Sequence, residues 1–265
     1  MNKFIKLIIP PILLSLINNI KPSRYGWKGK YKTWVEASKD CTGYSDEIII
    51  KKVRKSMMSV KMGLAVYERD SVLFKETKYN WPLLTALLFS HSKKNHLSII
   101  DFGGSLGSSY YQNKKYLIHL KNLKWGIVEQ PSFVKVGKEE FENNSLKFFN
   151  NIEECNNEIN PNTLLLSSVL QYLEDPYKHL EYLLSHNYKT IIIDRTPFVL
   201  GHEYVTIQHV PPKIYKASIP CWFFNENKLL NLFSKNKYHL VDTFETIEEK
   251  TSNYEFKGFI FEKSI

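Results

Sequence analysis

The segment SIIDFGGSLG, residues 98–107, joins an apolar run to a turn made of small residues. The run has the length of a buried strand and contains an acid, Asp101, near its end. The turn carries Gly103, Gly104, Ser105 and Gly107. Small residues let the backbone approach a bound ligand closely. We therefore expect a strand followed by a turn that leaves room for a nucleotide-like cofactor.

Short apolar runs continue from this segment toward the C-terminus, separated by stretches of helix length. The runs are LSIID, WGIVE, LKFF, TLLLSS and TIIID, followed by YHLVDTF and FKGFIFEK. Parallel neighbours need crossover connections, so the first five runs predict a doubly wound, mostly parallel sheet. The last two predict a hairpin at its edge. The fold class expected is α/β, with seven strands in one Rossmann-like domain over residues 82–265.

Residues 1–81 are expected to precede this domain as an amphipathic segment and a helical cap. The chain from Trp27 to about Trp81 is predicted to be helical, with Thr33 and Glu36 at capping-box spacing and SDE (45–47) as a second helix start. A helix opened by Pro82 should then turn its leucines toward the sheet, namely Leu83, Leu84, Leu87 and Leu88.

The first 20 residues, MNKFIKLIIPPILLSLINNI, bear on localisation. Pro10 and Pro11 interrupt the apolar stretch, no A-x-A cleavage site follows, and the stretch is short for a membrane span. Residues 12–20 are amphipathic if helical. This segment either docks on the protein itself or a second subunit, or lies in a membrane interface. The expected location is the cytoplasm, with peripheral contact at the inner membrane face as the alternative.

Composition narrows the function classes. The chain has 265 residues, 43% of them hydrophobic and 14% aromatic, enough for a globular core. The formal charge is +9, but the lysines are scattered, so no nucleic-acid partner is expected. The three cysteines are far apart and form no CxxC motif, which argues against disulfides and zinc. His202 and His209 lack metal-ligand spacing, so no metal is expected.

The glycine turn discriminates between two cofactor classes. A dinucleotide fingerprint G-x-G-x-x-G started at Gly103 requires glycine at positions 105 and 108, and both are serine. The pattern acid-x-Gly-x-Gly-x-Gly, typical of S-adenosylmethionine-dependent methyltransferases, matches Asp101, Gly103, Ser105 and Gly107 with one departure. Glu129 ends the second run, where a carboxylate can accept both ribose hydroxyls.

The segment after the fourth run is more specific. It reads SSVLQYLEDP, residues 167–176, and resembles the V-L-x-H/Y-x-x-D-P pattern that follows strand four in class I methyltransferases. The resemblance places Ser168 and Tyr172 beside the cofactor, with Tyr172 also within reach of the methyl acceptor.

Further segments extend this resemblance along nearly the whole chain: YGWKGKYKTWVEA, GYSDEII, AVYERDSVLF, DFGGSLGSSY, VEQPSFVKVG, DRTPF, VPPKIYKASIPCWFF and FKGFIFEK. The chain resembles a class I S-adenosylmethionine-dependent methyltransferase family found among bacterial surface-polysaccharide and O-antigen biosynthesis genes. Ser105 matches the glycine turn of that family. The resemblance implies methyl transfer from S-adenosylmethionine without naming an acceptor. Because the family points to surface-glycan synthesis, the N-terminus is apolar and residues 215–224 are aromatic, we expect the acceptor to be a saccharide or a lipid-linked saccharide.

Candidate catalytic residues lie after the fifth run. Asp194 and Arg195, in DRTPF, stand where groups can face the transferred methyl, or they form an ion pair at the sheet edge. His209 is a candidate base, or an ordinary hydrogen-bonded histidine.

Two further segments are candidates for binding the acceptor. VYERDS supplies Tyr67, Arg69 and Asp70, as a lid, an anion site or a structural ion-pair cluster. PPKIYKASIPCWFF supplies Tyr215 and Trp222, as the wall of a sugar or lipid pocket or as loop packing.

Two rival functions remain open at this point. One is a methyltransferase fold kept as a non-catalytic binding or assembly subunit of a glycan-synthesis complex. The other is a dehydrogenase, which the missing glycines disfavour.

Overall fold

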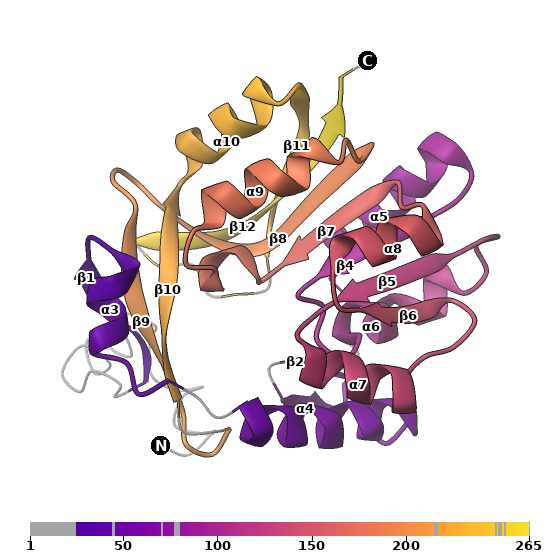
Figure 1. Ribbon diagram of the computed structural model, residues 1–265, viewed down its shortest axis with the longest axis horizontal. Helices are drawn as coiled ribbons and strands as arrows, with labels where there is room; N and C mark the ends of the chain where they lie inside the picture. Colours follow the sequence, from indigo (N-terminus) through magenta and orange to yellow (C-terminus); the bar gives the residue numbers. More distant parts are fainter. Residues whose placement is uncertain are drawn as a thin grey trace, which may run out of the picture.

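The computed structural model describes residues 25–43, 46–69, 71–76, 80–214, 217–246, 248, 251 and 253–264 (Figure 1). The N-terminal amphipathic segment, Asp70 and Tyr215 lie outside the described residues. Within the described ranges, no helix has the length and apolar character needed to cross a membrane.

Five parallel strands form the centre of the sheet, in the order β6-β5-β4-β7-β8. Their bounds are β4 (Ser98–Phe102), β5 (Lys124–Val128), β6 (Leu146–Phe149), β7 (Thr163–Ser167) and β8 (Thr190–Val199). The hairpin of β11 (Tyr238–Glu245) and β12 (Tyr254–Lys263) continues this sheet, with β12 antiparallel to β8. Numbered along the chain, these seven strands lie in the order 3-2-1-4-5-7-6. The predicted Rossmann-like sheet with its edge hairpin is confirmed.

Helices cover both faces of this sheet (Figure 1). Their bounds are α4 (Asp46–Lys61), α5 (Trp81–Lys94), α6 (Ser108–Leu117), α7 (Pro131–Glu140), α8 (Ile152–Ile159), α9 (Pro176–Ser185) and α10 (Glu226–Lys235). Successive residues of a strand face opposite sides, so Ile99 packs with α4 to α7 and Ile100 with α8 to α10. Burial on both faces explains why the parallel strands read as continuous apolar runs.

The prediction of a helical segment from Trp27 to about Trp81 is wrong in two places. β1 (Gly26–Tyr31) is a strand, and β2 (Tyr67–Arg69) and β3 (Val72–Phe74) form a hairpin. Between them, α4 and α3 (Trp34–Lys39) are helices, and α3 starts with the predicted capping box of Thr33 and Glu36. β1 is largely exposed and its partner strand lies about 180 residues along the chain, so local periodicity gave no signal.

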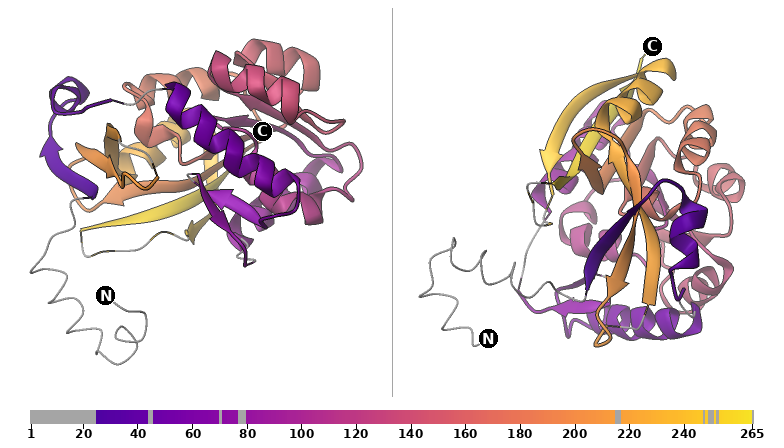
Figure 2. Two further views of the ribbon diagram at one scale, coloured as in Figure 1. Left: turned by 90° about the horizontal axis from the view of Figure 1, so that it is seen from below. Right: turned by 90° about the vertical axis from the view of Figure 1, so that its left-hand side faces the viewer.

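Strand β1 belongs to an antiparallel extension of the sheet. It pairs with β9 (Tyr204–Val210), which pairs with β10 (Ala217–Asn225), and the end of β10 runs parallel to the end of β8. Figure 2 shows these three strands side by side beyond the parallel core. This extension forms one wall beside the carboxyl ends of the parallel strands.

Helix α5 carries most of the predicted apolar face. Leu83, Leu84 and Leu87 are buried, whereas Leu88 is 39% exposed, so its assignment to the buried face is wrong. The N-cap is Asn80, whose side chain accepts a hydrogen bond from the Leu83 amide. Asn80 is itself buried, and its position matters for the site described next.

Candidate functional site

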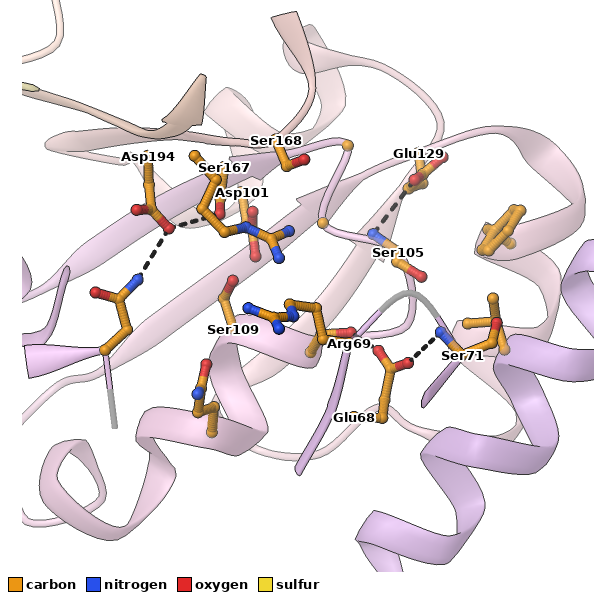
Figure 3. Close-up of a pocket in the computed structure, with 18 of the residues that line it drawn as sticks. Glu68, Arg69, Ser71, Asp101, Ser105, Ser109, Glu129, Ser167, Ser168 and Asp194 are labelled. Atoms are coloured by element: carbon orange, nitrogen blue, oxygen red, sulfur yellow. Dashed lines mark hydrogen bonds between the residues drawn. The ribbon is translucent and has the colours of Figure 1, made fainter. Parts of the chain in front are cut away.

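A cavity of about 200 Å³ lies at the carboxyl ends of β4, β7 and β8 (Figure 3). Its walls come from the glycine turn, the strand ends, the start of α6 and the β2–β3 hairpin. Most of its lining is polar or ionisable, including Glu68, Arg69, Asp101, Glu129 and Asp194. This inner cavity stands where ligands bind in open α/β sheets.

The glycine turn is shaped by the protein's own atoms. Gly103 has φ +72°, and a Cβ there would lie 2.5 Å from Cγ2 of Val169. A Cβ at Gly104 would lie 2.5 Å from the carboxyl carbon of Asp101. Gly107, with φ +96°, is the N-cap of α6. At Gly103 and Gly104 the missing side chains therefore make room for neighbouring side chains, which revises the expectation that they only make room for a ligand.

Strained backbone is concentrated around the inner cavity. Ser71, Ser105, Ser168 and Arg195 have φ between +51° and +64°, and all four line it. The other described non-glycine residues with positive φ are four asparagines and Lys237. Asparagine adopts this conformation readily, whereas serine and arginine do so at a cost of about 1–2 kcal/mol each. The fold holds these four residues against their conformational preference, as proteins do at binding sites.

A β-bulge brings Asp194 and Arg195 to the same cavity. On β12, Phe259 pairs with Ile193 and Lys257 with Thr196, so Gly258 alone faces two residues of β8. Successive residues of a regular strand point to opposite faces, but the extra residue at the bulge turns Arg195 toward the side of Asp194. Both residues therefore line the cavity, as the sequence placed them.

Asp194 is 1% exposed, and only one of its two carboxylate oxygens accepts hydrogen bonds. Its Oδ2 accepts hydrogen bonds from Nδ2 of Asn80 at 3.1 Å and from Oγ of Ser167 at 3.0 Å. Its Oδ1 is buried without a hydrogen-bond partner. Burial raises the pKa of Asp194, and the neighbouring Arg195 guanidinium opposes this shift. Asn80 was not predicted as a site residue; Asn-x-Pro at a helix start signals a cap, but not a contact with the cavity.

Two more carboxyl groups flank the glycine turn. Glu129 accepts hydrogen bonds from the Ser105 and Gln130 amides, at 3.3 and 2.8 Å, and burial raises its pKa while these bonds oppose the rise. Asp101 is 1% exposed, and its Oδ2 accepts a hydrogen bond from Nε1 of Trp125 at 3.0 Å. Burial raises the pKa of Asp101 to about 7. Asp101 therefore changes its charge near neutral pH.

Two guanidinium groups face these carboxylates. Glu248, after β11, lies 3.6 Å from Nη1 of Arg69 and 3.7 Å from Nη1 of Arg195. Glu68, 5% exposed, accepts a hydrogen bond from the Ser71 amide and contacts the Ser108 hydroxyl. Glu68 lies within the VYERDS segment but was not among the site residues predicted from it, and Glu248 was not predicted because it stands near no motif in sequence.

Buried polar atoms without a hydrogen-bond partner gather at this cavity. Among the described residues, Nη1 of Arg69, Oγ of Ser71, Oδ1 of Asp194 and Oε2 of Glu248 are buried without a hydrogen-bond partner. The first three residues line the cavity, and Glu248 contacts both arginines. Buried polar groups are normally paired, so these atoms indicate a site for a ligand with both donors and acceptors.

A groove of about 850 Å³ adjoins the inner cavity and shares Gly103, Glu129, Ser168 and Tyr172 with it. Its far wall is the β1–β9–β10 extension, which contributes His209 and several apolar residues. The Tyr172 hydroxyl, at the junction of the two, donates a hydrogen bond to Oε1 of Gln208 at 2.9 Å. The groove continues outward from the cavity between the parallel core and the extension.

The structure brings together most of the predicted cofactor residues. The inner cavity is lined by Asp101, Gly103, Gly104, Ser105, Glu129, Ser168 and Tyr172, together with Arg69, Asp194 and Arg195. His209 lines the groove instead, so the three catalytic candidates are not one cluster.

The remaining predicted residues lie elsewhere. Gly107 caps α6 and does not line the cavity. Tyr67 is buried and stacked on Phe74, with centroids 4.6 Å apart. Trp222 lines a separate cleft. No group of three His, Cys, Asp or Glu side chains suited to a metal occurs among the described residues.

Comparisons with known proteins give structural neighbours only. No family model matches the chain, and no curated protein matches its sequence. An S-adenosylmethionine-dependent methyltransferase from Clostridium acetobutylicum ATCC 824 aligns with TM-score 0.44 and 10% identity, over 69% of this chain and 91% of that one. Magnesium protoporphyrin IX methyltransferase from Synechocystis PCC 6803, with bound SAM, gives TM-score 0.46 and 13% identity over 80% and 97%.

A third neighbour is the N-terminal domain of EvdMO1, determined in the presence of SAH and D-fucose. It gives TM-score 0.48 and 9% identity over 84% of this chain and 98% of that one. The strand order 3-2-1-4-5-7-6, with its antiparallel seventh strand, assigns the chain to the Rossmann-like methyltransferase fold.

Proposed function

We propose that the protein is an S-adenosylmethionine-dependent methyltransferase that acts on a saccharide or a lipid-linked saccharide in surface-glycan biosynthesis. The observation that supports this cofactor is that different polar groups stand at the two ends of the inner cavity. Glu129 stands at one end and Asp194, with its unpartnered Oδ1, at the other (Figure 3), and the Arg69 guanidinium also lines the cavity.

Each end suits one part of this cofactor. The Glu129 carboxylate can accept hydrogen bonds from two ribose hydroxyls. Nη1 of Arg69 lies 3.6 Å from Glu248 but has no hydrogen-bond partner, so the guanidinium can also receive a carboxylate. The unpartnered Oδ1 of Asp194 suits an ammonium group, and an α-amino acid supplies both. In this proposal Asp194 binds the methionine moiety of the cofactor. His209 then remains as the candidate catalytic base.

The charge of the cavity also supports a cation. Four carboxyl groups line it, those of Glu68, Asp101, Glu129 and Asp194, against the guanidiniums of Arg69 and Arg195. When ionised, these carboxylates outnumber the cations. The proposed cofactor carries a sulfonium and an ammonium against one carboxylate, so its net charge is positive. A carboxylate-rich, buried cavity favours such a ligand.

The groove supports a neutral, hydroxyl-bearing acceptor. Its described lining holds no lysine or arginine, so an anionic acceptor would find no cation there. Apart from the shared Glu129, Ser168 and Tyr172, hydrogen-bonding side chains come from Gln130, Asn150, Gln208 and His209, and the rest is mainly proline, isoleucine, valine and aromatic surface. Few polar groups on apolar walls are typical of small-molecule sites.

The proposed chemistry needs few protein groups. When bound, the cofactor supplies an electrophilic methyl on sulfur. The groove aligns an acceptor hydroxyl and excludes water, which together account for much of the rate in a displacement of this kind. Because a hydroxyl loses its proton on methylation, a base is needed, and His209 is the titratable imidazole of the groove. Tyr172, fixed by Gln208, marks the junction where acceptor and cofactor meet.

Calorimetry with S-adenosylmethionine, S-adenosylhomocysteine and NAD tests the cofactor. We expect binding of the first two and none of NAD, and a loss of affinity in Asp194→Asn. Methyl-labelled cofactor incubated separately with glycan, protein and nucleic-acid extracts tests the acceptor. Label only in protein or nucleic acid would contradict a saccharide acceptor, and label in none would favour a non-catalytic binding subunit.

A further inference from the structure

A second cleft, of about 890 Å³, lies beside the groove. Its walls are the turn before α3, the start of α9 and Trp222 of β10. Trp34 lines both this outer cleft and the groove, so the two hollows meet at one side chain. A ligand that extends from the groove past Trp34 would reach the outer cleft.

The outer cleft combines aromatic rings with balanced charge. Trp34, Tyr182 and Trp222 line it together with two lysines and two acids, which are Lys32, Lys178, Glu174 and Asp175. Equal numbers of lysines and acids leave no net charge, counting the histidine as neutral. A ligand rich in phosphate would meet two carboxylates, whereas a neutral polar ligand meets donors and acceptors in equal supply.

The rings are held in place by their neighbours. Nε1 of Trp222 donates a hydrogen bond to the Glu174 carbonyl at 3.4 Å, and its ring lies within 22° of parallel to that of Phe224. The Tyr182 hydroxyl donates a hydrogen bond to Glu153, and Tyr182 as a whole is 42% exposed. Fixed rings cost little conformational entropy when a ligand stacks on them.

We propose that the outer cleft is a subsite for a saccharide chain, which holds a further sugar unit of the acceptor while another unit is methylated in the groove. Sugar rings present C–H faces that stack on aromatic rings and hydroxyls that bond to polar side chains. Both partners are present here, on a surface without net charge. This inference rests on the proposed saccharide acceptor, and it makes that acceptor longer than one sugar.

Ligand-observed NMR titration of the full chain tests the subsite. The probes are neutral trisaccharides of glucose, galactose, mannose and rhamnose, each with its methyl monosaccharide. We expect at least one trisaccharide to bind more tightly than its monosaccharide. Tyr182→Ala should then lower trisaccharide affinity roughly three- to ten-fold, the value of one aromatic contact. Monosaccharide and S-adenosylmethionine affinities should stay unchanged.

Tyr182→Phe is the matched control, because it keeps the ring and removes only the bond to Glu153. Tyr116→Ala, on α6, controls for loss of an aromatic side chain elsewhere. Equal affinity for mono- and trisaccharides, no binding of any probe, or equal effects of Tyr182→Ala and Tyr182→Phe would overturn the subsite. Failure of S-adenosylmethionine to bind would contradict the proposed function but not a subsite that passes these tests.

Discussion

The inner cavity and the groove beside it are built from different parts of the chain and carry different chemistry. The cavity holds four carboxyl groups and two guanidiniums, set mainly at the ends of the parallel strands. The groove holds one carboxylate, Glu129, and its far wall is the antiparallel extension. The contrast suggests that charge selects the ligand of the cavity, and that shape and hydrogen bonds select the ligand of the groove. Substitutions on the two sides should therefore have separable effects.

The largest expected effect is on the groove side. His209→Gln should lower the rate of methyl transfer roughly 100-fold or more, the usual contribution of a general base. Cofactor affinity should stay unchanged, because His209 does not line the cavity. Single-turnover kinetics and calorimetry measure the two quantities. A loss of cofactor affinity with an unchanged rate of methyl transfer would contradict the assignment of cofactor binding to the cavity and of the base to the groove.

The second effect concerns stability on the cavity side. Asp101 has a folded-state pKa of about 7 against 3.8, so the folded state keeps a proton that the unfolded state has lost. The free energy of unfolding should therefore fall as pH rises from about 4 to 7, and level off above 7. Asp101→Asn should remove this part of the slope, on the order of 3 kcal/mol.

Urea denaturation at pH 5 and pH 8 measures this difference. Asp194 and Glu129 also have raised pKa values, and they contribute a slope of the same sign to both proteins. The comparison of parent and variant isolates Asp101. An identical slope in the two proteins would mean that Asp101 stays ionised in the folded state.

A third test asks why Gly103, which lines both regions, is glycine. Gly103→Ala should destabilise the fold by about 3 kcal/mol, from the clash with Val169 and from a positive φ. The double variant Gly103→Ala, Val169→Ala should recover the clash component. If the double variant folds but binds no cofactor, the ligand also needs the space at Gly103. If it binds normally, internal packing alone explains the glycine.

The smallest of these effects is expected at Glu129, which the two regions share. Glu129→Ala should weaken S-adenosylmethionine binding by about 1.5–3 kcal/mol, the value of a hydrogen bond to a charged group. Glu139→Ala, on the exposed surface of α7, is the charge control and should bind as the parent does. If calorimetry gives equal affinities for both variants, Glu129 does not bind the cofactor.

Much of the fold and half of the site followed from local sequence. The five buried runs gave the parallel strands, because strands covered on both faces are continuously apolar. The turn at residues 103–107 and Glu129 gave the cavity's position, because carboxyl ends of parallel strands meet at one edge. These features depend on residues close together in the chain.

Tertiary structure decided the rest, because it depends on contacts between distant segments. The exposed strand β1 exists through its pairing with β9, about 180 residues away. Asn80 reaches the cavity from the start of α5, whose own sequence carries no ligand motif. The bulge opposite Gly258 turns Arg195 beside Asp194, and no local pattern in β8 announces it. Local sequence determined the strands and the glycine turn, whereas long-range pairing decided which side chains complete the cavity and what forms the groove.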